Sequence, residues 1–163
     1  MSKNVSFLDE IEEKAERYDR EYRGCAQSVL RALQEAFGHE CNEVFKTAFG
    51  FGGGLSRMKS VCGALIGGYM ALGLTFGRGW HDFKYNPWPN EKRLQIYKEK
   101  FQKLYKMFVD EYGSDNCYDI IGFDLNDPED YKEFQKRENH VKCEQRCGKV
   151  ARWTAELILK DYK

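Results

Sequence analysis

Six cysteines are the residues of this chain whose type and spacing could do chemistry, at positions 25, 41, 62, 117, 143 and 147. Cys25, Cys62 and Cys117 each lie at or near the start of a predicted helix. A helix N-terminus presents unpaired N–H groups and partial positive charge, which favour a thiolate over a thiol. Thiolates bind metals and attack disulfides, so this placement predicts a shared redox or metal site. The competing interpretation is that a small residue simply suits a helix start.

Cys143 and Cys147 are one helical turn apart, and His140 lies just before them. This spacing puts both sulfurs on one helix face, where they could share a metal. Val150 and Leu157 continue the same face, so core packing is the alternative. The chain has no second local Cys or His pair of zinc-finger type and no Cys-x-x-Cys redox pair.

A glycine-rich break, FGFGGG, occupies residues 49–54. It lacks the Gly-Lys-Ser/Thr ending of a phosphate-binding loop, and no predicted strand precedes it, so no nucleotide cofactor is expected. Its amides could face an anion or cluster sulfides, assisted by Arg57 and Lys59. We favour the simpler interpretation, a close backbone approach beside the helix that follows Cys62.

The composition is that of a compact chain without a nucleic-acid partner. The 163 residues include 26 Lys and Arg and 26 Asp and Glu, so the net charge is zero, whereas nucleic-acid binding needs a basic excess. We expect one helical domain over residues 1–163. The charged amphipathic N-terminus does not read as a signal peptide, so we expect a cytoplasmic protein with reduced thiols.

Apolar residues recur every three or four positions through most of the chain, and no alternating strand pattern stands out. The predicted fold is all-α, a compact multi-helix bundle around a buried, Gly-rich central helix. That central helix falls in the uncharged stretch 60–77, whose five glycines argue against a membrane span. The other predicted helices cover about 8–22, 25–37, 42–48, 90–113, 117–121, 129–136 and 142–160, with an aromatic loop at 78–90.

Close approach of another backbone is expected at Gly63, Gly67 and Gly68 of the central helix. In a homodimer, the Gly63/Gly67 face or the Trp80–Trp88 loop would serve as the interface. The sequence does not choose between a monomer and a dimer.

Four segments of the sequence, taken together, are recognisable. They stand in order along the chain and resemble the Cys-GCAxxG-Cys-Cys family of redox-active proteins over about residues 20–160. The resemblance implies four signature cysteines, which match Cys25, Cys62, Cys117 and Cys147; Cys41 and Cys143 lie outside the pattern. The segments are GCAQSVL (24–30), FGFGGGLSRMKSVCGALIGGYMALGL (49–74), GSDNCYDIIGFDL (113–125) and CGKVARWTAELI (147–158).

The resemblance also implies a function. A related domain in split-Soret multihaem cytochromes holds an iron–sulfur centre through cysteines, and family members often occur near genes for oxidoreductases or transporters. This chain has no Cys-x-x-Cys-His motif, so haem is not expected. The leading hypothesis is a cytoplasmic redox protein with an iron–sulfur or other metal centre held by the four signature cysteines, acting in electron transfer. A thiol–disulfide protein and a non-catalytic helical interaction module are the alternatives, and whether the chain is an enzyme stays open.

Overall fold

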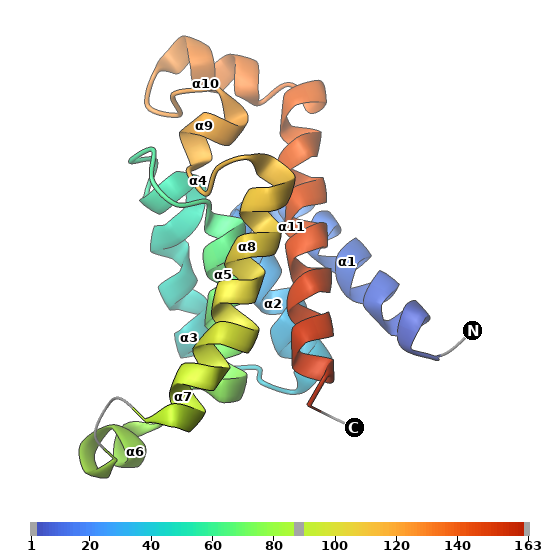
Figure 1. Cartoon of the computed structure of the whole chain (residues 1–163). Coiled ribbons are helices and arrows are strands. Elements are labelled where there is room, and N and C mark those ends of the chain that lie inside the picture. The colour runs from blue at the N-terminus through green and yellow to red at the C-terminus, as the bar shows by residue number, and fades with distance from the viewer. Residues whose placement is uncertain (1–2, 87–89, 162–163) are drawn as a thin grey trace.

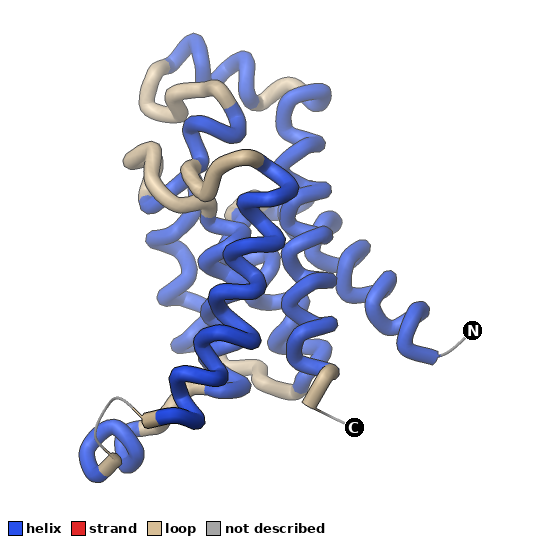
Figure 2. Tube along the Cα trace, in the orientation of Figure 1, coloured by secondary structure: helices blue, strands red, loops and turns tan. Residues whose placement is uncertain are grey.

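The computed structural model describes residues 3–86 and 90–161, with side chains from residue 7 onward, and its regular elements are helices (Figures 1 and 2). Across these residues the extended backbone is limited to one antiparallel bridge, between Val61 and Asn116. The all-α prediction is confirmed. The elements are α1 (Lys3–Tyr22), α2 (Cys25–Phe37), α3 (Asn42–Thr47), the 3-10 turn η1 (Ala48–Phe51), α4 (Gly52–Leu55), α5 (Gly63–Phe76), α6 (Trp80–Tyr85), α7 (Glu91–Ile96), the π-helical η2 (Tyr97–Gln102), α8 (Lys103–Tyr112), α9 (Cys117–Ile121), α10 (Pro128–Phe134) and α11 (Arg137–Leu159).

Helix α5 is the predicted central helix, and it lies among α2, α8 and α11 (Figure 1). A Cβ atom at Gly67 would come within 2.5 Å of the Ala26 carbonyl oxygen on α2. A Cβ atom at Gly68 would come within 2.8 Å of Thr154 Oγ1 on α11 and 2.9 Å of a Leu104 methyl on α8. These contacts leave no room for a side chain, so the two glycines allow the helices to pack closely.

The longest helix, α11, packs along α1, which joins the two ends of the chain. A Cβ atom at Gly148 would lie 2.5 Å from Glu16 Cγ and 3.0 Å from the Glu12 carbonyl oxygen, so glycine is required for this approach. At the edge of the contact, Arg152 forms ion pairs with Asp9 and Glu12 at 2.5 and 2.9 Å. Burial of the apolar faces of α1, α2, α5, α8 and α11 forms one continuous core cluster.

Helix ends follow the local sequence. Asn90, Asn116 and Asp127 each accept a hydrogen bond from a backbone N–H of the first turn of α7, α9 and α10. Gly38 and Gly113 end α2 and α8 with φ of 69° and 78°, in the left-handed region that glycine adopts without strain. The helix from Asn90 to Gly113 is therefore confirmed, as a rod formed by α7, η2 and α8.

Two features differ from the sequence prediction. The aromatic stretch 78–90 contains α6, whose Trp80 and Phe83 rings stack at 5.8 Å on the exposed side of the molecule. Residues 87–89 of that stretch, with Trp88, lie outside the described residues. Helix α11 begins at Arg137, a turn before the predicted start at 142, because its first turn carries no apolar stripe for the pattern to show.

The Gly63/Gly67 face, one of the two surfaces expected for a dimer interface, is covered in this chain by Phe51, Cys25 and α2. These small residues serve packing within the chain, and the existence of a homodimer stays a prediction. Of the helices in the described part of the chain, none combines the length and apolar character that a membrane crossing requires.

Candidate functional site

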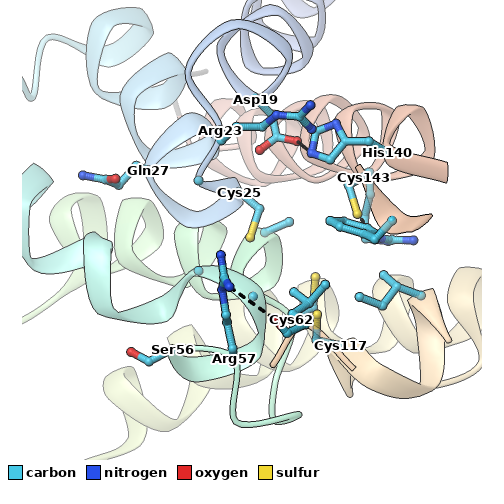
Figure 3. A pocket seen from close by; sticks show the side chains of 18 of the residues that line it. Asp19, Arg23, Cys25, Gln27, Ser56, Arg57, Cys62, Cys117, His140 and Cys143 are labelled. Carbon is cyan, nitrogen blue, oxygen red and sulfur yellow. Dashed lines mark hydrogen bonds and ion pairs between the residues drawn. The ribbon is translucent and has the colours of Figure 1, made fainter. Parts of the chain in front are cut away.

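A cavity of about 560 Å³ opens at the end of the bundle where α2 and α5 begin and α9 and α11 pass. Four sulfurs border it, those of Cys25, Cys62, Cys117 and Cys143, and they face a common space (Figure 3). Four separate elements therefore supply one thiol each. The polar side chains of the lining include Asp19, Arg23, Gln27, Ser56, Arg57, Gln135, His140 and Arg146.

Backbone pairing brings Cys62 and Cys117 together. The Cys62 N–H donates to the Asp115 carbonyl at 2.8 Å, and the Cys117 N–H donates to the Ser60 carbonyl at 2.7 Å. These bonds flank the Val61–Asn116 bridge, so the two cysteines are diagonal neighbours on one face of an antiparallel pair. Cys62 is the N-cap of α5, and Cys117 is the first residue of α9. The predicted helix-start positions are thus confirmed, and with them that of Cys25 on α2.

Two glycines make room for the thiols. A Cβ atom at Gly63 would lie 2.5 Å from Cys25 Sγ and 2.6 Å from the Phe51 carbonyl oxygen. One at Gly54, where φ is +75°, would lie 2.6 Å from Cys117 Cβ and 2.8 Å from the Ser60 carbonyl oxygen. The close backbone approach favoured from the sequence is therefore confirmed, at the wall of the cavity.

The chain around this wall has an unusual backbone. Residues 53–57 all have positive φ, and three of them are not glycine: Leu55, Ser56 and Arg57, at 61°, 53° and 66°. Each such residue costs roughly 1–2 kcal/mol relative to the right-handed region, so the surroundings must stabilise the turn. Ser56 Oγ donates to the Gly50 carbonyl at 2.8 Å, and the Ser60 N–H donates to the Gly54 carbonyl at 3.0 Å.

Residues 122–127, between α9 and α10, and the start of α10 contact this turn. Arg57 donates to the Leu125 carbonyl at 3.1 Å, and its guanidinium lies over the Tyr131 ring at 4.3 Å. The Asn126 side chain donates to the Arg57 carbonyl at 2.8 Å, and Lys59 pairs with Asp124 at 2.6 Å. Lys59 is therefore engaged by Asp124, whereas Arg57 borders the cavity with only its Nη1 atom hydrogen-bonded among the described residues, to the Leu125 carbonyl.

Helix α11 places its two cysteines differently. Cys143 borders the cavity, and Arg146 Nη1 donates to its sulfur at 3.3 Å. Cys147 is fully buried behind the cavity wall, and its sulfur points to the Cys25 carbonyl oxygen at 3.8 Å. Of the four predicted site residues, the cavity therefore brings together Cys25, Cys62 and Cys117. The sequence offered Cys143 only through its helical spacing from Cys147, and the family pattern left its role open.

Burial raises the pKa of every thiol near the cavity. It raises the pKa of Cys117 to about 12 and that of Cys143 to about 11, and it moves the pKa values of Cys62, Cys25 and Cys147 upward as well. The expectation that helix starts would favour thiolates in this state was wrong, because loss of hydration outweighs the helix end.

Some groups oppose this effect at Cys62. The charge of Arg146 and the backbone N–H groups of Ala64 and Leu65 at the start of α5 lower its pKa, although burial dominates. The Gly53 amide acts in the same sense on the pKa of Cys25. The cavity therefore supplies cationic and N–H groups that would stabilise negative charge on sulfur.

A buried polar network lies beside the thiols. His140 faces Glu144 through Nδ1 at 3.1 Å and Asp19 through Nε2 at 3.4 Å. Glu144 also pairs with Arg20 and Arg137, at 3.1 and 2.6 Å, so the network reaches the protein surface. Sequence reasoning treated the histidines as scattered, because only the packing of α1 on α11 brings Asp19 and His140 together.

The thiols border the cavity without converging on one point. Within residues 3–86 and 90–161, no three Cys, His, Asp or Glu side chains lie close enough together to share one metal ion. The four sulfurs that border the cavity are donors of the type that iron–sulfur clusters take, in which the thiolates bind different iron atoms.

Together these features define an all-α protein with a thiol-lined internal cavity. The family model described as "putative redox-active protein (C_GCAxxG_C_C)" matches residues 24–157, and the chain belongs to this family. A protein of Archaeoglobus fulgidus, described as uncharacterized, is 37% identical over 113 residues, which cover 66% of this chain and 74% of that protein. No solved structure matches the chain.

Proposed function

We propose that this protein is a redox protein whose centre occupies the thiol-lined cavity, and that the centre is an iron–sulfur cluster acting in electron transfer. The observation that carries the proposal is the meeting of Cys25, Cys62 and Cys117, from three helix starts, at one cavity of about 560 Å³. Packing alone would leave no such space, since protein interiors are filled to the density of organic crystals.

The chemistry of the site supports the proposal. Thiolates are the usual ligands of iron–sulfur clusters, and buried N–H groups and cations near the sulfurs tune the potential. A cluster held by thiolates is anionic, so Arg146 and the Gly53 amide are suitable neighbours for it. When bound, the cluster supplies one-electron transfer. The reduced thiols that it needs persist in the cytoplasm, where we place the protein.

The test is the content of iron, zinc and acid-labile sulfide in protein purified without oxygen. We expect iron and sulfide near one cluster per chain or per dimer. Cys25→Ser, Cys62→Ser and Cys117→Ser should each lower that content severalfold, whereas Cys41→Ser, whose thiol lies away from the cavity, should not. Unchanged metal content in all three cavity variants would overturn the proposal.

A thiol–disulfide function is the second candidate, favoured by the diagonal placement of Cys62 and Cys117 across the Val61–Asn116 bridge. In that reaction the two thiols lose two protons and two electrons to a disulfide or quinone acceptor, and one S–S bond forms. Absence of metal, with a mass loss of two hydrogens on oxidation that Cys62→Ser abolishes, would establish it. Slow thiols with neither metal nor oxidation would instead support an interaction module. An oxidoreductase or transporter partner and a homodimer stay predictions.

A further inference from the structure

The family pattern and the structure disagree about the fourth cysteine. The pattern selects Cys147, but this residue is 0% exposed and its sulfur faces the carbonyl oxygen of Cys25 rather than the cavity. Cys143, one turn earlier on α11, borders the cavity opposite Cys62 and Cys117 (Figure 3).

Arg146 provides an independent observation. It is only 5% exposed, and its Nε atom has no hydrogen-bond partner among the described residues. Its Nη1 atom contacts Cys143 Sγ at 3.3 Å, and its guanidinium lies 4.9 Å from the centre of the Tyr112 ring. A buried cation with an unsatisfied donor is costly unless an anion shares its surroundings.

Asp19 carries a second buried polar atom that accepts no hydrogen bond, although it faces His140. It is 2% exposed and borders the cavity, and its Oδ2 atom lies 3.4 Å from His140 Nε2 without forming a hydrogen bond. Arg146 Nε and Asp19 Oδ2 are thus two buried polar atoms without a hydrogen bond, in residues that border the same cavity, whereas buried polar atoms are usually hydrogen-bonded.

We infer that Cys143, with Arg146 as its cationic neighbour, is the fourth thiol of the redox centre, and that Cys147 is a packing residue beneath Cys25. The inference rests on the proposed function. When a metal binds, the Cys143 thiol releases its proton to solvent and one sulfur–metal bond forms, without electron transfer. Arg146 is a positioning residue, which holds the sulfur and offsets its negative charge.

The first test compares metal and sulfide content in Cys143→Ser and Cys147→Ala, with Cys41→Ser as the matched control. We expect Cys143→Ser to lose most of its metal, whereas Cys147→Ala and the control keep wild-type content. The reverse result, with Cys147→Ala depleted and Cys143→Ser loaded, would overturn the inference.

The second test does not depend on loading. Native, reduced, metal-free protein is treated with N-ethylmaleimide, and the modified cysteines are mapped by mass spectrometry. Cys143 should react at least tenfold faster than Cys147, and Arg146→Gln should slow that reaction severalfold while Arg146→Lys restores part of it. Equal rates at Cys143 and Cys147 would contradict the inference.

The two tests separate this inference from the proposed function. If wild-type protein holds no metal, the proposed function fails, and the alkylation order alone decides whether Cys143 is the fourth cavity thiol. If Cys143→Ser and Cys147→Ala both lose metal, protection of Cys143 from N-ethylmaleimide in loaded wild-type protein supports the inference, and the absence of protection overturns it.

Discussion

Glycines lie at both the first turn and the middle of α5, but the two regions use them for opposite purposes. In the middle, Gly67 and Gly68 bring α2, α8 and α11 so close that no space remains. At the first turn, Gly63 makes way for the Cys25 sulfur beside an open cavity. The same residue type therefore closes the core in one place and keeps a sulfur at the edge of an open space in the other. The role of a glycine in this helix therefore follows from the atoms that surround it and not from the residue type alone.

Gly67→Ala should give the largest loss of stability in this comparison. The new Cβ atom would meet the Ala26 carbonyl oxygen at 2.5 Å, and backbone cannot move aside cheaply. Overpacking of this kind costs about 1–3 kcal/mol of the free energy of unfolding, measured by urea denaturation. Gly73→Ala on the same helix is the matched control, because nothing lies within 4 Å of its Cβ position; it should stabilise by about 0.5–1 kcal/mol. Equal effects of the two substitutions would show that α5 is not packed as described.

Gly63→Ala should affect both the stability of the fold and the metal content of the cavity, whereas Gly67→Ala should affect stability alone. Its Cβ atom would lie 2.5 Å from Cys25 Sγ and 2.6 Å from the Phe51 carbonyl oxygen, so the thiol and the neighbouring backbone must shift. We expect a stability loss of about 1–2 kcal/mol together with a severalfold loss of metal per folded chain. The folded fraction of Gly67→Ala should keep its metal, since that site is a turn or more from the thiols. Full metal content in Gly63→Ala would contradict the conclusion that the first turn of α5 forms part of the metal site.

The last prediction concerns pH and distinguishes buried thiols from exposed ones. An unfolded thiol loses its proton near pH 8.5, whereas the folded protein raises the pKa of Cys117 to about 12. Between these values the unfolded chain binds fewer protons, so the stability of reduced, metal-free protein falls as pH rises. Each such thiol contributes at most about 1.4 kcal/mol per pH unit. Urea unfolding from about pH 8 to about pH 10 measures the slope; Cys117→Ala should flatten it, and an unchanged slope would contradict the raised pKa.

Local patterns predicted the parts of this fold that depend on local interactions. The caps at Asn90, Asn116 and Asp127 and the Gly38 and Gly113 termini follow from residue types that satisfy helix ends. Helix-start positions of three cysteines could therefore be read from the sequence. The aromatic helix α6 could not, because it is short, exposed and without an apolar stripe.

The parts that depend on docking between helices were not predictable. Cys143 and Cys147 are one turn apart, and the way α11 docks on its neighbours places only the first at the cavity. Likewise, Leu55, Ser56 and Arg57 carry no local signal for positive φ; the hydrogen bonds from the segment between α9 and α10 hold them there. Arg146 gave no signal as a buried cation, because arginine is usually found at the surface.

The residues that form the cavity wall are far apart in the sequence, and this spacing affects when the cavity can form during synthesis. Helix α11 is the last of the described helices in the sequence, yet it supplies one wall of the cavity and the sulfur of Cys143. Since synthesis proceeds at roughly 5–20 residues per second, the cysteines of α2, α5 and α9 exist for some seconds before that wall does. During this interval they are ordinary thiols of an unfinished chain. If the proposed centre is present, it can therefore be loaded only after the polypeptide is complete and the bundle has closed.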